Sequence, residues 1–371
     1  MTDQTWRAIG LMSGTSMDGI DIALVETDGV SVENLGPAGF HPYDSADRLL
    51  LRKALDAATD LTDRDARPGV LAEAEAMVTH RHIRALEGYL ASCRLGRRDV
   101  DVIGFHGQTV LHRPEAGLTV QIGNGHALAV HFGVPVVHDF RAADVALGGQ
   151  GAPLVPLFHQ ALVRRAGAVG PVAVLNLGGV ANITYVGANG ADVLIACDTG
   201  PGNALIDDFM LQRTGSPVDR DGVNASRGDV DEAAVEFLMN HAFFVRPPPK
   251  SLDRNAFIAP DLSALSVADG AATLTEFSAR AVAHVIPLLP HPPKLWVICG
   301  GGARNRELVR RIGVNTGARV VIADELGWSA DSMEAQAFAY LAVRSVRGLP
   351  LSLPTTTGVP EPARGGVIAR P

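Results

Sequence analysis

Two segments of the chain, one near the N-terminus and one near the middle, share a pattern of strand, glycine-containing turn and strand. The first reads RAIGLMSGTSMDGIDIALVETDG and the second reads VAVLNLGGVANITYVGANG. In each segment an apolar run leads into a polar turn and a second apolar run follows, as in a β-hairpin. The two copies are too far apart for a solenoid repeat, which recurs every 20 to 50 residues or so. The pattern instead predicts two similar lobes, each presenting one hairpin tip to a shared cleft.

The rest of the chain alternates between short apolar runs and longer stretches with helical periodicity. Strands and helices mixed in this way predict an α/β architecture. The expected strands are Ala8–Met12, Ile20–Val25, Val102–Phe105, Val134–Val137, Val172–Leu175, Ile183–Val186, Val193–Ala196, Leu295–Cys299 and Val320–Ala323. The expected helices are Ala46–Ala58, Val70–Ser92, Val230–Phe243, Ala271–Leu289, Asn305–Ile312 and Ser332–Arg347.

Clusters of glycine and proline suggest where the lobes divide. The segment RAADVALGGQGAPLVP, residues 141–156, is rich in both and is the expected crossing between lobes. We therefore expect an N-terminal lobe over residues 1–145 and a C-terminal lobe over residues 146–354. The last residues, 355–371, form an expected irregular tail that packs back on the N-terminal lobe.

Composition excludes several classes of protein. The chain has 371 residues, with 32 Lys+Arg against 40 Asp+Glu, so its formal net charge is −8. An acidic balance argues against a general nucleic-acid binder and against a polybasic membrane anchor. Glycine is common, with 40 residues, against a usual share of about 7%. This excess predicts many loops whose function is carried by the backbone.

Cysteine usage and the N-terminus point to the cytoplasm. The cysteines Cys93, Cys197 and Cys299 are scattered and lack metal-binding or redox spacing, which fits a reducing compartment. The N-terminus MTDQTWRAIG does not read as a secretory leader, and no run of about 20 apolar residues predicts a membrane span. We expect a cytoplasmic protein with neither a membrane nor a nucleic-acid partner.

The first glycine-rich turn, residues 14–19, has the composition of an anion-binding loop. Glycine lets a ligand approach the backbone closely and leaves N–H groups to face an anion. Asp18 and Asp21 suit Mg²⁺ beside phosphate oxygens. An ordinary hairpin turn uses the same residue types, so both interpretations stay open. The candidate phosphate-binding residues here are Gly14, Thr15, Ser16, Met17, Asp18, Gly19, Ile20 and Asp21.

Other nucleotide and protease motifs are weaker. No Gly-Lys pair occurs, which excludes a Walker A loop, and no GxGxxG follows a strand. GTSM, HGQT and DTG imitate a subtilisin-type protease with Ser16, His106 and Asp198 as triad. Their chain order is the reverse of that fold, and a strand follows Ser16 where a nucleophile would begin a helix. The single DTG also disfavours an aspartic protease, which needs a carboxylate pair.

Polar residues at strand ends gather in the middle of the chain, where open α/β folds bind ligands. His106 and Gln108 suit sugar hydroxyls or an amide, although a satisfied half-buried histidine is an equal alternative for His106. Arg141 suits a ligand carboxylate, which a guanidinium binds through two parallel hydrogen bonds. The alternative role for Arg141 is a salt bridge between lobes. Asp144 is a hydrogen-bonding acid or a helix-cap residue.

Asp198 is the best candidate for a general base. It ends the apolar run Val193–Cys197, so we expect it at a strand end facing a cleft, although an Asx-turn role is the alternative. Gly200, Gly202 and Asn203 follow it in a backbone-rich turn able to hold substrate.

Two further groups suit a nucleotide. The second hairpin tip supplies candidate phosphate-binding residues. The CGGGARN loop has three glycines without side chains, so its backbone can lie against adenine or ribose. The alternative is that these glycines only allow a helix and a strand to cross closely. Glu334 lies early on a late helix and faces either a cleft or solvent. The nucleotide-binding candidates are Asn176, Gly178, Gly179, Asn182, Gly300, Gly301, Gly302 and Asn305.

Together these blocks closely resemble the anhydro-N-acetylmuramic acid kinase family. The matching stretches run in order along nearly the whole chain: IGLMSGTSMDGIDIAL, GFHGQTV, VQIGNG, DFRAADVALGGQGAPLVP, LNLGGVANIT, CDTGPGN, CGGGARN and SMEAQAFA. The resemblance implies a two-lobed actin-like or sugar-kinase fold, ribonuclease H-like in each lobe, with ATP in the cleft. One departure is at PKSLDRNAF, where members often carry Thr-Gly in place of Leu252-Asp253.

The resemblance also implies the reaction. Water attacks C1 of 1,6-anhydro-N-acetylmuramic acid while the γ-phosphoryl group of ATP passes to O6, in peptidoglycan recycling. Asp198 would act as base, and Mg²⁺ would lie near Asp18. Arg141 would take the lactyl carboxylate and Glu334 would orient substrate. A homodimer is the family expectation. Two alternatives stay open: a hydrolase using Ser16, and a non-catalytic ATP-binding module.

Overall fold

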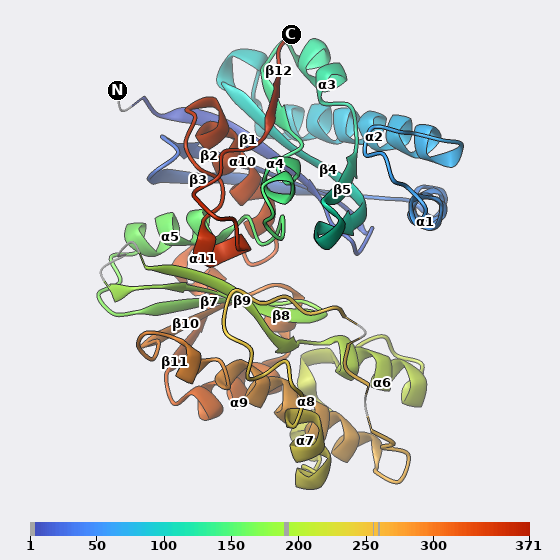
Figure 1. Cartoon of the computed structure of the whole chain (residues 1–371), viewed down its shortest axis with the longest axis vertical. Helices are drawn as coiled ribbons and strands as arrows, with labels where there is room; N and C mark the ends of the chain where they lie inside the picture. Colours follow the sequence, from blue (N-terminus) through green and yellow to red (C-terminus); the bar gives the residue numbers. More distant parts are fainter. Residues whose placement is uncertain (1–3, 189–192, 255, 259) are drawn as a thin grey trace. The chain divides into compact units, whose positions relative to one another are not determined.

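The computed structural model describes residues 4–188, 193–254, 256–258 and 260–371. It is a mixed α/β structure that divides into two compact units (Figure 1). The first unit combines Met1–Arg165 with Ser332–Pro371, and the second unit is Ala166–Asp331. These boundaries differ from the expected ones at 145/146 and 354/355, because helices α5 (Pro156–Arg165) and α10 (Met333–Val346) pack on the first unit.

In the described part of the first unit, seven strands form one sheet. Their order is β12-β6-β4-β1-β2-β3, and β5 pairs with β4. β1, β2 and β3 are mutually antiparallel, whereas β4 and β6 run parallel to β1. The strands are β1 (Trp6–Ser13), β2 (Gly19–Thr27), β3 (Val32–Pro42), β4 (Val102–Arg113), β5 (Leu118–Ile122), β6 (Val136–His138) and β12 (Val367–Ala369).

The second unit repeats this arrangement in a described sheet of five strands, in the order β11-β10-β7-β8-β9. β7, β8 and β9 are antiparallel, and β10 and β11 run parallel to β7. The hairpin β1–β2 therefore has the same place in its sheet as β7–β8, which confirms the expected two-lobed ribonuclease H-like α/β fold. The strands are β7 (Val172–Leu177), β8 (Val180–Val186), β9 (Leu194–Pro201), β10 (Leu295–Cys299) and β11 (Arg319–Ile322).

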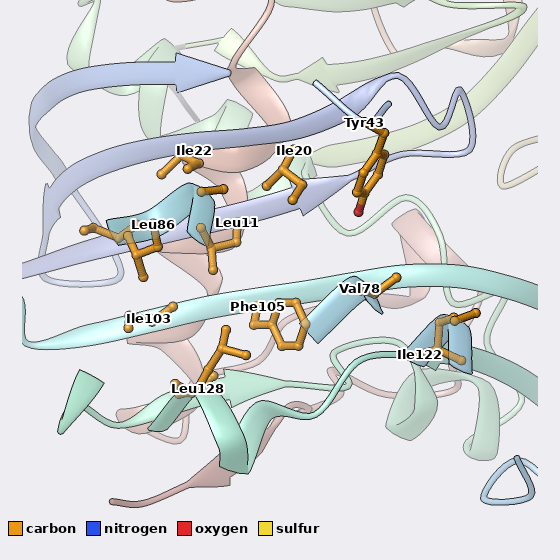
Figure 2. Close-up of a cluster of buried hydrophobic side chains, with 14 of the residues drawn as sticks. Leu11, Ile20, Ile22, Tyr43, Val78, Leu86, Ile103, Phe105, Ile122 and Leu128 are labelled. Carbon is orange, nitrogen blue, oxygen red and sulfur yellow. The ribbon is translucent and has the colours of Figure 1, made fainter. Parts of the chain in front are cut away.

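Helices cover both faces of the first sheet. One face carries an apolar cluster in which Leu11, Ile103 and Phe105 from the strands meet Val78 and Leu86 (Figure 2). Burial of such side chains is the main favourable term in folding. The helices of this unit are α1 (Ser45–Ala58), α2 (Val70–Cys93), α3 (Gly125–Phe132), α4 (Ala142–Ala146), α5 (Pro156–Arg165), α10 (Met333–Val346) and α11 (Pro354–Thr357).

The opposite face of the first sheet is covered by α10 at very short range. Gly10 of β1 and Gly104 of β4 are direct partners in the strand register. A Cβ added at Gly10 would lie 1.8 Å from the carbonyl oxygen of Ala335, and one at Gly104 would lie 2.2 Å from that of Phe338. The two glycines thus let the helix backbone rest directly on the strands, because no side chain intervenes.

In the second unit, α8 is the central helix. Its residues from Gly270 to Phe277 are buried, since it packs on β9 and α9 and also on α6 and α7. One apolar cluster fills the space between the sheet and α8–α9, and another joins α8 to α6 and α7. These helices are α6 (Ala204–Thr214), α7 (Glu232–Met239), α8 (Val267–Ala283) and α9 (Arg306–Thr316).

Every expected strand and helix overlaps an observed one, but several elements lacked a sequence signal. The edge strand β3 has the exposed, proline- and glycine-containing sequence VENLGPAGFHP, which shows no alternation. Helix α5 follows directly on the segment expected to cross between lobes and belongs to the first unit. Among the described residues, no helix is long and apolar enough to span a bilayer.

We predict that Gly10→Ala destabilises the protein, because the added methyl group meets the backbone of α10 and either the helix or the strand must move. Overpacking of this kind costs about 1–3 kcal/mol or more. Gly88→Ala is the matched control: Gly88 lies within α2, and a Cβ there meets nothing within 4 Å. This control should gain about 0.5–1 kcal/mol. Urea unfolding measures both, and a Gly10→Ala protein as stable as the parent would contradict the prediction.

Candidate active site

The first glycine-rich turn, residues 14–18, joins β1 to β2 and is open to solvent at its tip. Thr15, Ser16 and Asp18 are exposed there. Ser16 Oγ donates to Asp18 Oδ1 over 2.6 Å. The tip therefore offers hydroxyls, one carboxylate and backbone N–H groups, which are groups that bind phosphate and its accompanying cation.

The residues that follow the tip lie in β2 and serve packing. A Cβ on Gly19 would lie 2.4 Å from the carbonyl oxygen of His41, so the glycine allows β3 to approach. Ile20 is fully buried in the apolar cluster, and Asp21 is half-buried and already engaged within the chain. The side chain of Ile20 is therefore unable to contact a ligand, contrary to the sequence-based expectation.

Gln108 anchors the turn of residues 14–18 through a hydrogen bond to its backbone. It is 1% exposed, and its Nε2 donates to the carbonyl oxygen of Gly14 over 3.1 Å. Ser13 Oγ donates to Gln108 Oε1 over 2.5 Å and lies 3.1 Å from the hydroxyl of Tyr43. These bonds use the polar atoms of Gln108 within the protein, so the residue supports the first glycine-rich turn.

His106 is likewise committed to the protein. It is 3% exposed; its Nε2 accepts from Arg141 Nε over 3.0 Å and its Nδ1 lies 2.8 Å from the carbonyl oxygen of Gly107. Because Arg141 only donates, these contacts require the neutral tautomer with the proton on Nδ1. Burial, and then the Arg141 charge, lower the pKa of His106 to about 3. His106 thus orients Arg141, and its ring nitrogens are both used within the protein.

The Ser16 hydrolase is ruled out by the same contacts. Ser16 Oγ donates to Asp18, and both ring nitrogens of His106 are engaged by Gly107 and Arg141. A serine nucleophile needs a histidine base within hydrogen-bond reach and with a free nitrogen. Among the described residues no hydrogen bond joins Ser16 to a histidine, and the histidine of the expected triad, His106, has both ring nitrogens engaged.

Arg141 is anchored through two of its three guanidinium nitrogens. In addition to the contact with His106, Nη1 donates to the carbonyl oxygen of Gly151 over 2.8 Å. Within the described residues no carboxylate forms an ion pair with it, and Nη2 has no hydrogen-bond partner. Burial lowers the pKa of Arg141, whereas the charges of Glu334 and Asp144 raise it. A half-buried guanidinium that is fixed and uncompensated is suited to an anionic group of a ligand.

Asp144 does not face a ligand. Its Oδ2 accepts from the N–H of Gly151 over 2.6 Å, and its Oδ1 accepts from Thr357 Oγ1 over 2.6 Å and from Ser352 Oγ. The carboxylate thereby clamps the GGQG loop to the C-terminal segment, and it is 2% exposed. Both carboxylate oxygens are thus used inside the protein, so the structure gives Asp144 a structural role, and the expected substrate contact stays a prediction.

Glu334 lies in the first turn of α10, and its side chain is exposed. Surrounding protein atoms raise the pKa of Glu334, whereas the positive charge of Arg141 lowers it. The two side chains therefore influence each other electrostatically without forming an ion pair. Of the sequence-based substrate candidates in this unit, Arg141 and Glu334 are the ones with polar atoms left for a ligand.

The second glycine-rich turn joins β7 to β8 and is fastened by its carbonyl groups. Gly178 O accepts from the N–H of Asn203 over 2.8 Å, and Gly179 O accepts from the N–H of Gly202 over 2.8 Å. The N–H groups of Gly178 and Gly179 have no acceptor among the described residues. A Cβ on Gly202 would lie 2.4 Å from Gly178 O, so only glycine allows this contact.

The CGGGARN loop packs against the same hairpin. A Cβ on Gly300, whose φ is +79°, would lie 2.2 Å from Asn176 Oδ1. A Cβ on Gly302 would lie 2.6 Å from Leu177 Cβ, whereas a Cβ on Gly301 meets nothing within 4 Å. The loop is thus locked to the hairpin at its first and third glycines and is open at its middle one.

These two glycine segments line one cavity of about 510 Å³ in the second unit. Such a volume is in the range of small-molecule and cofactor sites. Asn305 is one of its residues, although its Oδ1 also caps α9 by accepting from the N–H of Leu308. The cavity is lined by Leu177, Gly178, Gly179, Asn203, Asp207, Val218, Asp219, Arg220, Asp221, Gly301, Arg304 and Asn305.

Asp207 is a cavity residue that sequence reasoning missed. It lies in the first turn of α6, and burial raises the pKa of its carboxyl to about 6, with further raising by Asp208 and lowering by Arg254. Sequence patterns predict that an acidic residue inside a helix is exposed to solvent, so they did not distinguish Asp207 from other surface residues. Its nearness to the hairpin depends on the turn Gly202–Asn203.

The strand register of the second sheet aligns three candidates in a row. Asn176 of β7 is the partner of Asn182 in β8, and Asn182 is the partner of Asp198 in β9. Directly opposite residues in neighbouring strands project from the same face with Cβ atoms about 5 Å apart. The alternate residues Leu175, Ile183 and Cys197 face the α8–α9 core. The asparagines and Asp198 therefore share the other face.

Asp198 is within β9, and not after it as expected. Its Oδ2 accepts from the N–H of Leu252 over 2.7 Å, and its own N–H donates to the carbonyl oxygen of Lys250 over 2.9 Å. Burial raises the pKa of Asp198 to about 6, and the Leu252 N–H and the Lys250 charge limit this rise. Oδ1 has no partner among the described residues. A half-buried carboxylate with one tethered and one free oxygen fits a general base.

The turn after Asp198 has a different role from the expected one. A Cβ on Gly200, whose φ is +151°, would lie 2.9 Å from Ala281 Cβ on α8, so this glycine serves packing. Asn203 Nδ2 donates to the carbonyl oxygens of Leu177 and Gly178, each over 3.2 Å. Asn203 therefore fastens the hairpin at the cavity and is not placed as a sugar ligand.

Relatives with known names cover the whole chain. A family model described as anhydro-N-acetylmuramic acid kinase matches residues 6–371. The protein of that name from Nitrobacter winogradskyi is 57% identical over 365 residues, covering 98% of this chain and 99% of its own. The one from Azorhizobium caulinodans is 59% identical over 370 residues, with 98% and 99% covered.

Two solved structures share the fold class at low sequence identity. A ROK family glucokinase from Streptomyces griseus in complex with glucose and AMPPNP has a TM-score of 0.41 at 14% identity, covering 91% of this chain and 99% of its own. The component A of (R)-2-hydroxyglutaryl-CoA dehydratase from Acidaminococcus fermentans has a TM-score of 0.46 at 10% identity, with 92% and 99% covered. At these values no conclusion about ligands follows. From the family model and the relatives above half identity, the chain belongs to the anhydro-N-acetylmuramic acid kinase family.

Proposed function

We propose that this chain uses ATP and water to convert 1,6-anhydro-N-acetylmuramic acid into N-acetylmuramic acid 6-phosphate and ADP. A water oxygen bonds to C1, the bond between C1 and O6 breaks, and O6 takes the γ-phosphoryl group from ATP. The proton released by water goes to the base. No acid is needed to protonate O6, because the phosphoryl group takes that place.

The observation that carries this proposal is the state of Asp198. The carboxylate is tethered by Oδ2, leaves Oδ1 without a partner in the described chain, and has a pKa raised to about 6. At neutral pH it is ionised and yet basic enough to accept a proton, which is the range in which general bases work best. A purely structural aspartate would be expected to have both oxygens bonded, as Asp144 does.

The nucleotide is assigned to the cavity of the second unit. The free N–H groups of Gly178 and Gly179 suit phosphate oxygens, and the open backbone at Gly301 suits a flat adenosine. The exposed hydroxyls and N–H groups of residues 14–18 provide a second set of phosphate donors.

Mg²⁺ is assigned to Asp18. Its carboxylate is exposed, and in the described chain it accepts one side-chain hydrogen bond, from Ser16 Oγ to Oδ1. One carboxylate together with substrate phosphates is a usual environment for this ion, and no cluster of three or more ligating side chains occurs in the described residues. When bound, Mg²⁺ neutralises charge on the transferring phosphoryl group.

Arg141 is assigned to the lactyl carboxylate, since its guanidinium is fixed by His106 and Gly151 and has no ion-pair partner in the described chain. Glu334 then faces substrate hydroxyls.

The same proposal gives the protein a role in peptidoglycan recycling in the cytoplasm. It also makes the protein a homodimer, and light scattering on the purified protein tests this oligomeric state. A non-catalytic nucleotide-binding module would instead release no ADP when the anhydro sugar is added.

We predict that Asp198→Asn lowers kcat by about 10²–10⁴-fold, because a positioned base contributes a factor of this size. The amide can still accept from the Leu252 N–H, so the fold should be kept.

In the parent protein, kcat/KM should fall tenfold per pH unit below about pH 6, where Asp198 becomes protonated. A coupled ADP-release assay measures both. Asp208→Asn is the control, since Asp208 is exposed and its ion pair in the described chain is with Arg254. Turnover near that of the parent in Asp198→Asn would remove this residue from the mechanism.

We predict opposite behaviour for two neighbouring glycines. Gly301→Ala should raise the KM for ATP without changing the melting temperature, because its methyl group enters the open cavity. Gly302→Ala should lower the melting temperature, because its methyl group would press on Leu177 and Asn203. Thermal unfolding and ATP titration separate the two. An unchanged KM for ATP in Gly301→Ala would argue against a nucleotide at this loop.

We predict that Arg141→Met reduces kcat/KM for the natural sugar by about 10- to 100-fold, the value of a hydrogen bond to a charged group. The anhydro sugar that lacks the lactyl group should be turned over by parent and variant at similar rates, because it has no carboxylate to lose. This second substrate serves as the control. Equal losses for both sugars would show that Arg141 acts through the fold.

A further inference from the structure

Lys250 is a buried lysine in the segment that follows the proline cluster of the second unit. It is 6% exposed. Its Nζ donates to the carbonyl oxygens of Phe243 and Phe244 over 3.1 and 3.3 Å and lies 4.4 Å from the centre of the Phe243 ring. In the described part of the chain no carboxylate forms an ion pair with it.

An ammonium group in such surroundings is costly to bury, because carbonyl oxygens and a ring replace its water only in part. Burial accordingly lowers the pKa of Lys250. The chain has only three lysines, Lys53, Lys250 and Lys294, and otherwise uses arginine for positive charge. A role for this charge is therefore to be sought in what lies beside it.

The segment from Lys250 to Leu252 is bonded to Asp198 at both of its ends. The carbonyl oxygen of Lys250 accepts from the N–H of Asp198, and the N–H of Leu252 donates to Asp198 Oδ2. Through Nζ, Lys250 also ties this segment to the chain at residues 243 and 244. The three contacts fix the direction of the carboxylate without using Oδ1.

We propose that Lys250 is a positioning residue for the base Asp198: its ammonium group anchors the segment 250–252 that holds Oδ2, and its positive charge keeps the carboxylate ionised. This inference rests on the proposed function. It deepens that function by naming how the base is held and charged.

Among the described residues, the groups around Asp198 leave this role to Lys250. On β9 itself the adjacent titratable group is Cys197, where burial raises the pKa of the thiol to about 12. Across the sheet the partner of Asp198 is the uncharged Asn182. Beyond Lys250 lies Arg246, whose like charge lowers the pKa of the lysine. Among the described groups, Lys250 is the cation whose charge acts on Asp198.

The bond between residue 252 and Asp198 does not depend on the side chain at position 252. Residue 252 bonds to Asp198 through its backbone N–H, which every residue except proline supplies. A different side chain at this position therefore changes the surface of the segment but not the tether.

The test compares four variants of the full-length protein by ADP release with 1,6-anhydro-N-acetylmuramic acid from pH 5 to pH 9 or so. Lys250→Met and Lys250→Gln remove the charge, and the glutamine can still donate to one carbonyl if the methionine variant fails to fold. Both should lower kcat, leave the KM for ATP unchanged and move the acid limb of kcat/KM to higher pH. A displacement of one pH unit corresponds to a tenfold lower kcat/KM on the acid side.

Lys250→Arg should keep the acid limb of the parent protein, since it retains the charge. Lys294→Met is the matched control, because Lys294 is exposed in the same unit. A folded Lys250→Met or Lys250→Gln with the parental acid limb overturns the inference, whether or not kcat falls. If Asp198→Asn is inactive while both neutral variants behave like the parent, only this inference fails; if Asp198→Asn is active, the proposed function itself fails.

Discussion

Contact of backbone with backbone, made possible by glycine, is the constraint on which the structure depends. In the first unit, Gly10 and Gly104 let α10 rest on the strands. In the second unit, Gly202 admits the carbonyl of Gly178, and Gly302 admits the side chain of Leu177. Each contact is too short for a Cβ atom, so these positions accept no other residue without movement. The packing of α10 and the shape of the cavity in the second unit both follow from them.

Hydrogen-bond accounting separates structural polar residues from functional ones. His106, Gln108 and Asp144 are buried, and the structure supplies partners for their polar atoms. Arg141 and Asp198 keep one nitrogen and one oxygen, respectively, without a described partner. Buried polar groups are usually satisfied, so an atom left without a partner in the described chain is the better indicator of ligand binding.

The two sheets show how one hairpin design serves different purposes. β1–β2 and β7–β8 have the same place in their sheets and present glycine-rich turns. In the first, the turn is held from below by the Gln108 side chain. In the second, the turn is fastened through its own carbonyl groups. Both arrangements leave N–H groups at the tip, which is the feature that phosphate requires.

The sequence by itself determined the α/β class, the two equivalent hairpins and the candidate base, because these depend on local apolar patterns and on turn composition. The exposed strand β3 has no such pattern and was missed. Only the tertiary structure decided that His106 and Asp144 are internal supports, that Asp207 lines the cavity, and that the backbone from Lys250 to Leu252 bonds to Asp198. Those outcomes depend on which atoms distant segments bring within hydrogen-bond range, and a linear pattern contains no information about partners so far apart.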